Sequence, residues 1–129
     1  MVNKFLLKMW IKSHRIKVLH SVSGRMRIKV PGMDKLPDRY KIYEPKLTEL
    51  FLLLRGILRV EYSYMTGKIL IEYDHKKVDE RQVLAWSEHI WDSLTKRAVE
   101  RDKPPSKEEL EAELDAFMKV MQQDVLKIQ

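Results

Sequence analysis

The chain has no cysteine among its 129 residues. This absence excludes disulfides, thiolate zinc sites, iron–sulfur clusters and cysteine nucleophiles. Nothing therefore points to an oxidising compartment, and we expect a cytoplasmic protein. A chain of this length can bury a hydrophobic core in one domain without such cross-links.

Long apolar runs are also missing. No stretch reaches the roughly 18 apolar residues that a membrane span needs. The first fourteen residues, MVNKFLLKMWIKSH, are basic and apolar, but Lys8 and Lys12 interrupt any signal-peptide core. Phe5 and Trp10 in this segment suit an amphipathic helix that lies on an anionic membrane or docks on a partner. We expect a protein that is soluble or peripheral to a membrane.

Acidic residues are absent from the first 32 positions, which carry eight Lys or Arg. The rest of the chain has seventeen basic and nineteen acidic residues, so the net charge of +6 comes from the N-terminal part. This asymmetry favours an anionic partner for that part, which an acidic protein, a lipid surface or nucleic acid would supply. The alternative is that the charge only keeps a small domain in solution.

Catalytic motifs are missing too. The sequence has no glycine-rich phosphate loop, nucleophile elbow or metal-hydrolase motif. Asp74 and His75 are adjacent, and adjacent residues at a strand end point apart, so they do not form a catalytic pair. We expect no enzyme activity.

Residues 16–30 alternate with period two, which predicts β-structure with one apolar face and one basic face. A single strand of this length would be unusually long, so we predict a hairpin with the three-residue loop 22–24. That loop pairs His20 with Met26 on the buried face. An alternative function follows, in which these two side chains hold a metal ion or haem.

The basic face of this hairpin is the main candidate site. Lys17 faces Lys29, a like-charge pair that is unfavourable unless an anion lies between them. The candidate anion- or partner-binding residues are Arg15, Lys17, Gly24, Arg25, Arg27 and Lys29. Nucleic acid is the least expected partner, because these strands carry no aromatic side chains for base stacking.

The later elements define the fold. We predict an irregular crossing over 31–45, a helix over 46–56, a hairpin of strands 57–64 and 68–74, a helix capped by Asp79, and a last helix with a capping box at Ser106 and Glu109. The order predicts an α+β ferredoxin-like sandwich with a βαββα core. The leading strand replaces the fourth strand, and one extra helix follows at the C-terminal end.

Four segments result from this pattern. They are a basic amphipathic segment 1–14, a ferredoxin-like domain 15–99, a linker 100–105 and an amphipathic C-terminal helix 106–129. Leu114, Phe117 and Met121 belong to the apolar stripe of the last helix. This stripe is a candidate docking surface for a membrane, a partner or a second copy of the chain, and packing on its own domain is the alternative.

Two stretches resemble the heavy-metal-associated (HMA) domain family of metal-transporting P-type ATPases and metallochaperones. ILRVEYSYMTGKILIEYDHKKVDERQVLAW resembles the central hairpin and second helix of that family, and VPGM at 30–33 resembles the entry to its metal loop. The resemblance implies a ferredoxin-like fold. Lys35 and Asp38 stand where the family has its two cysteines, so we do not expect soft-metal binding by this loop.

The pattern His-x-x-x-Gly-Arg at 20–25, together with Arg27, more closely resembles a cysteine-free branch of these domains found within or beside such ATPases. Some members of that branch are associated with iron. The resemblance therefore implies a non-catalytic binding module in metal homeostasis, with iron the expected metal. The expected partner is a metal-transporting P-type ATPase or another assembly protein, and the resemblance identifies no cofactor.

Overall fold

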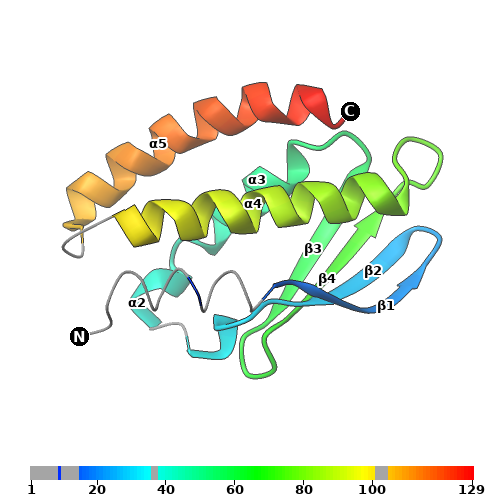
Figure 1. Cartoon of the computed structure of the whole chain (residues 1–129), viewed down its shortest axis with the longest axis horizontal. Helices are drawn as coiled ribbons and strands as arrows, with labels where there is room; N and C mark the ends of the chain where they lie inside the picture. Colours follow the sequence, from blue (N-terminus) through cyan, green and yellow to red (C-terminus); the bar gives the residue numbers. More distant parts are fainter. Residues whose placement is uncertain (1–8, 10–14, 36–37, 101–104) are drawn as a thin grey trace.

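The structure of the chain is a computed structural model that describes residue 9 and residues 15–35, 38–100 and 105–129 (Figure 1). Its strands are β1 (Lys17–Val22), β2 (Arg25–Lys29), β3 (Ile57–Ser63) and β4 (Lys68–Tyr73). Its helices are α2 (Asp38–Lys41), α3 (Glu44–Leu52), α4 (Glu80–Glu100) and α5 (Lys107–Asp124), with 3₁₀ turns η1 (Met33–Lys35) and η2 (Val125–Lys127).

The four strands form one antiparallel sheet in the order β1-β2-β4-β3. α3 connects β2 to β3, and α4 follows β4, which gives the βαββα order of a ferredoxin-like core. The edge beside β2 is occupied by β1, which precedes it in the chain. The predicted fold class is confirmed, including the leading strand in the place of a fourth one and the extra C-terminal helix.

The three-residue loop predicted between β1 and β2 is wrong. Val22 pairs with Arg25, so the turn contains only Ser23 and Gly24. Gly24 has a φ of 87°, the left-handed conformation that tight hairpin turns require and that glycine adopts without strain. A two-residue turn alone would set each apolar residue of β1 opposite a basic residue of β2.

A β-bulge at Leu19 compensates for the shorter turn. The register shifts between Val18 and His20, so that Leu19 is the extra residue in β1. Beyond the bulge, Val18 pairs with Ile28, and the strand returns to the predicted register. The bulge therefore divides β1 into two parts. Before the bulge the side chains lie on the predicted faces of the sheet, and between the bulge and the turn each side chain lies on the face opposite to the predicted one.

The chain between β2 and α3 is more regular than predicted, because η1 and α2 lie within the predicted irregular crossing. α3 begins two residues earlier than predicted and ends at Leu52. The turn after α3 brings Gly56 against the segment that connects β4 to α4. A Cβ atom on Gly56 would lie 2.7 Å from Cγ1 of Val78 in that segment. Gly56 also has a φ of 108°, so it allows both a backbone reversal and a close approach.

The hydrophobic core lies between the sheet and the helices. The side chains of β2 and β4 that face α3 and α4 are buried: Met26, Ile28, Ile69, Ile71 and Tyr73. Trp86 of α4 is fully buried, and its indole N–H donates to the carbonyl oxygen of Leu50 in α3 at 2.9 Å. This bond holds the two core helices together and satisfies a buried donor.

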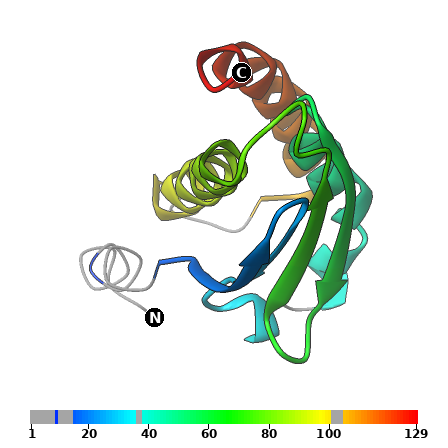
Figure 2. The same ribbon diagram turned by 90° about the vertical axis from the view of Figure 1, so that its right-hand side faces the viewer.

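The C-terminal helix α5 packs on the two core helices as a further layer. Figures 1 and 2 show α5 above α4, with the β1–β2 hairpin on the opposite side of α4. Phe117 and Met121 are buried in the same hydrophobic cluster as the sheet residues. His89 Nε2 lies 2.9 Å from the Asp124 carboxylate, which adds a polar contact between α4 and α5.

None of the helices in the described part of the chain combines the length and the apolar character that a membrane span requires.

Asp79 and Ser106 are confirmed as helix N-caps, and the capping box predicted at Ser106 and Glu109 is confirmed for the bond to the Ser106 hydroxyl. The backbone N–H of Gln82 donates to the Asp79 carboxylate at 2.8 Å, and the Gln82 side chain accepts from the Asp79 N–H at 3.0 Å. The backbone N–H of Glu109 donates to the Ser106 hydroxyl at 3.1 Å. Caps of this kind satisfy N–H groups that have no partner inside the helix.

A tyrosine pair joins α3 to β3. The hydroxyls of Tyr62 and Thr48 are 2.8 Å apart, and the Tyr64 hydroxyl donates to the Glu44 carboxylate at 2.6 Å. The two tyrosine rings stack with their centroids 6.2 Å apart. The pKa of Tyr62 is raised to about 12, mainly by burial; the Thr48 hydrogen bond opposes this shift and the Glu44 charge adds to it.

We predict that the two tryptophans of α4 differ in their effect on stability. Trp86→Phe removes a buried hydrogen bond and leaves a cavity, so it should lower the free energy of unfolding by about 2–3 kcal/mol. Trp91 has a buried indole N–H without a hydrogen-bond partner, so Trp91→Phe loses no such bond and should cost less than about 1 kcal/mol. Urea unfolding followed by far-UV circular dichroism measures both. Equal losses would contradict the assigned role of Trp86.

We also predict an alkaline loss of stability that depends on Tyr62. Its pKa is raised from 10.0 to about 12 in the folded chain, so between these values the unfolded state loses the proton and the folded state keeps it. The contribution of Tyr62 to the free energy of unfolding should be constant below about pH 9 and fall from pH 10 to 12. In Tyr62→Phe this fall should be shallower, as urea midpoints measured across that range will show. An identical slope in both proteins would contradict the prediction.

Candidate functional site: a basic face of the sheet

The sheet has an outer face, directed away from α3 and α4. Residues directly opposite each other in antiparallel strands share a face, so the strand pairing defines three rows of side chains across this surface. In the order β1, β2, β4, β3 the rows are Val22, Arg25, Glu72 and Arg59; His20, Arg27, Leu70 and Glu61; and Lys17, Lys29, Lys68 and Ser63. No described helix covers this outer face.

Charge is distributed unevenly over these rows. In the first row Glu72 lies between Arg25 and Arg59, and Arg59 forms an ion pair with Glu61 of the second row. The third row has three lysines on neighbouring strands and no acidic residue. Glu72 lies opposite Arg25 without forming an ion pair with it, so Arg27 and the three lysines of the third row are the cations with no acidic residue directly opposite.

Four of the six candidate anion-binding residues lie together on the outer face. Lys17, Arg25, Arg27 and Lys29 are exposed, and none of them forms an ion pair within the described part of the chain. The like-charge pair Lys17–Lys29 is present as predicted. Exposed guanidinium groups with unoccupied donors suit the binding of carboxylates or phosphates.

The other two candidates do not belong to this cluster. Arg15 precedes β1, and its guanidinium lies 3.4 Å from the carboxylate of Asp92 on α4. It therefore lies on the side of the helices, not with the basic row. Gly24 contributes its carbonyl oxygen, which accepts from the Tyr73 N–H at 2.9 Å, so its role in the structure is the hairpin turn and the β4 contact.

The predicted proximity of His20 and Met26 is wrong. The bulge at Leu19 turns His20 to the outer face, where it pairs with Arg27, whereas Met26 is fully buried on the inner face. The sheet thus separates the imidazole from the thioether. Among the described residues there is no group of three or more His, Cys, Asp or Glu side chains that could hold a metal ion.

The apolar stripe of α5 is not available as the predicted docking surface. Phe117 and Met121 are buried against the chain's own core, and Leu114 is partly buried. The stripe packs on its own domain, which is the alternative that the sequence analysis left open for this helix. Phe5 and Trp10, the other docking candidates, lie outside the described residues.

The positions that correspond to the cysteines of a metal loop hold no soft ligand. Lys35 is exposed at the end of η1. Asp38 begins α2 and accepts a hydrogen bond from Lys41 Nζ at 2.7 Å, and this contact lowers the pKa of the Asp38 carboxyl. The loop retains Met33 as a buried anchor, which is 9% exposed.

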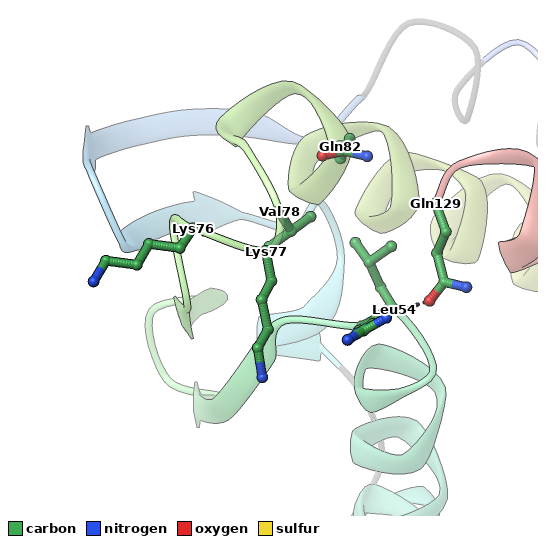
Figure 3. Close-up of a pocket in the computed structure, with 7 residues that line it drawn as sticks. Leu54, Lys76, Lys77, Val78, Gln82 and Gln129 are labelled. Atoms are coloured by element: carbon green, nitrogen blue, oxygen red, sulfur yellow. Dashed lines mark hydrogen bonds between the residues drawn. The ribbon is translucent and has the colours of Figure 1, made fainter.

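A second basic region surrounds a pocket of about 400 Å³. It lies at the end of the sheet that is farther from the row of Lys17, Lys29 and Lys68. It is lined by Leu54, Arg55, Lys76, Lys77, Val78, Gln82 and Gln129 (Figure 3). The Lys76 side chain extends away from Leu54 and Gln129, and the lysines do not converge on one point. The Arg55 backbone N–H donates to the Gln129 side chain at 2.8 Å. This bond holds the chain after η2 against the turn between α3 and β3, so the residues around the pocket have a structural role.

The strand order reveals two basic residues that the sequence analysis missed. Lys68 completes the lysine row, and Arg59 flanks Glu72. Both belong to the hairpin that was predicted from its alternation. Pairing β2 with β4 in the ferredoxin-like order would have placed Lys68 beside Lys29, but the sequence contains no local signal for that register.

The fold and this face together define a small α+β module whose open surface is a basic β-sheet. Comparison with protein families adds a specific assignment: the model of the family described as heavy metal associated domain 2 matches residues 5–127. The chain belongs to this family, which indicates a metal-related binding module. Comparisons with curated proteins and with solved structures find no match.

We predict that the lysine row destabilises the fold when no anion is bound. Lys29 lies between Lys17 and Lys68, so Lys29→Gln should raise the free energy of unfolding by about 0.2–1 kcal/mol at low ionic strength. The gain should shrink in 0.5 M salt because exposed charges are then screened. Thermal unfolding at both salt concentrations measures it, with Lys119→Gln on α5 as the control. A loss of stability at low salt would contradict the predicted repulsion.

Proposed function

We propose that the chain is a non-catalytic binding module of metal homeostasis, which associates with a metal-transporting P-type ATPase or another assembly protein. The observation that carries this proposal is the open outer face, where Arg25 and Arg27 have no ion pair within the described chain. Membership of the heavy metal associated domain 2 family supports the metal-related role.

The arginines suit carboxylates on a partner protein. Arg25 and Arg27 are two residues apart on one strand, so their guanidinium groups project from the same face about 7 Å apart along β2. A guanidinium group binds a carboxylate through two parallel hydrogen bonds, which gives geometric specificity as well as charge attraction. An acidic patch of similar spacing on the partner is the surface that this arrangement fits.

Iron is the metal we propose for the system in which the module acts. The support is the resemblance to the cysteine-free branch of HMA domains, together with the absence of any thiolate ligand for copper(I). His20 and Met26 lie on opposite faces of the sheet, which favours action through protein contact over metal binding by that pair. No observation favours the alternative of metal or haem binding by that pair.

Asp74, beside His75 in the sequence, also supports a non-catalytic role. The Asp74 carboxylate accepts from the backbone N–H of Lys76 at 3.0 Å, and its backbone carbonyl accepts from Lys77 at 3.0 Å. Asp74 thus stabilises the turn that leads from β4 to α4. It is engaged in local structure, and no described histidine is bonded to it.

We predict that Arg25→Ala with Arg27→Ala weakens partner capture. Affinity purification from the native cells, grown with and without iron and analysed by mass spectrometry, should recover a metal transporter or assembly protein with the wild-type chain. Loss of two charge-assisted contacts, each worth about 1.5–3 kcal/mol, should reduce recovery at least tenfold.

Lys119→Ala with Lys127→Ala is the matched control, because it removes the same charge from exposed residues of α5 and η2. It should leave recovery unchanged. Equal recovery with the arginine variant and the control would overturn the assigned face. Recovery of only metal-unrelated proteins would overturn the proposed system.

A further inference from the structure

One end of the outer face combines uncompensated charge with an exposed apolar side chain. Lys17, Lys29 and Lys68 form a row across β1, β2 and β4 at this end. The β3–β4 turn lies beside the row, because the Val30 N–H at the end of β2 donates to the Gly67 carbonyl at 2.8 Å. Met65 occupies this turn and is 94% exposed, more than any other large apolar residue described as exposed.

The three lysines form a short row of positive charge across neighbouring strands. Neighbouring strands are about 4.8 Å apart, so the three backbone positions span about 10 Å. A lysine ammonium is a compact charge on a flexible stem, without the fixed geometry of a guanidinium fork. Such an array matches many closely spaced anions on a surface better than a single oriented carboxylate.

The acidic residues at this end do not cancel the array. Asp34 lies near the turn, with its Cβ 3.9 Å from the position that a Cβ atom on Gly67 would occupy, and exposed Lys35 follows it directly in η1. Asp38 is paired with Lys41. The lysine row keeps its charge, since none of its three members forms an ion pair within the described chain.

Met65 lies at an exposed tip of the molecule, from which its side chain can reach the acyl region of a bilayer. The β3–β4 hairpin projects beyond the ends of the other strands in both views, and its turn forms the tip (Figures 1 and 2). Ile42, which is 64% exposed, follows Lys41, and Lys41 Nζ lies 5.0 Å from the ring of Tyr64 beside the turn. A second exposed apolar side chain is therefore adjacent in sequence to a residue that contacts this hairpin.

We propose that this end of the sheet docks on an anionic lipid bilayer, with Lys17, Lys29 and Lys68 on the headgroups and Met65 inserted at the acyl boundary. Basic residues near an anionic leaflet and a buried apolar side chain are the two contributions that hold peripheral proteins on membranes. Nucleic acid would use the lysines but gain nothing from an exposed methionine. This proposal goes beyond the arginine-dependent protein contact, which involves the other two rows of the face.

Vesicle co-sedimentation tests the charge contribution. Wild-type protein should bind vesicles of phosphatidylcholine with about 30% phosphatidylserine in low salt and should not bind pure phosphatidylcholine vesicles. Lys17→Gln with Lys29→Gln and Lys68→Gln should weaken binding about a hundredfold, which is about fivefold for each lysine. Lys107→Gln with Lys119→Gln and Lys127→Gln removes equal charge from α5 and η2 and should have no such effect.

The absence of cysteine makes the insertion of Met65 directly measurable. Met65→Cys supplies one attachment point for a polarity-sensitive fluorophore, whose emission should shift to the blue when anionic vesicles are added. The same label at Ala116→Cys, an exposed position on α5, should show no shift. Met65→Ser should weaken vesicle binding severalfold, and high salt should not abolish that difference.

Three results would overturn the proposal. In the first, the lysine variant binds vesicles as well as the wild type does. In the second, binding is lost only in Lys4→Gln with Lys8→Gln and Lys12→Gln, which would assign membrane contact to residues 1–14. In the third, the lysine variant loses binding to a DNA or RNA oligonucleotide while neither protein binds vesicles. The arginine variant should retain vesicle binding, so failure of the protein contact and failure of membrane docking are distinguishable.

Discussion

The structure depends on β2 being paired along both of its edges. β1 pairs with one edge and β4 with the other, so the alternation of five residues in β2 sets both faces of the sheet. Met26 and Ile28 can be fully buried only if their neighbours Arg25, Arg27 and Lys29 point outward. The hydrophobic core and the basic surface are therefore two consequences of one register, and neither can change without the other.

The bulge at Leu19 reconciles this register with a tight turn. A two-residue turn fixes the pairing of the half of β1 nearest to it, whereas the core requires Val18 opposite Ile28. One extra residue satisfies both demands. The same residue turns His20 outward and leaves Lys17 beside Lys29, so a local irregularity decides which ligands the sheet can offer.

The helices leave the outer face open because they cover only the inner one. α3 and α4 pack on the sheet, and α5 packs on those helices, so that its apolar residues Phe117 and Met121 join the same core. The like charges in the lysine row are tolerated because Lys17 and Lys29 are exposed to solvent and Lys68 is partly so, and charge repulsion in solvent is weak. The packing of the inner face thus stabilises the whole sheet, including the outer face, whose side chains add little to stability.

The sequence by itself determined the order of elements, the helix caps at Asp79 and Ser106, the β3–β4 hairpin and the basic character of β2, because each follows from local periodicity and turn chemistry. It also determined the absence of thiolate chemistry. Only the tertiary structure decided the bulge, the outward position of His20, the pairing of Arg15 with Asp92, the burial of the α5 stripe and the addition of Lys68 to the basic row. These features depend on contacts between segments far apart in the chain, and local sequence patterns carry little information about their register.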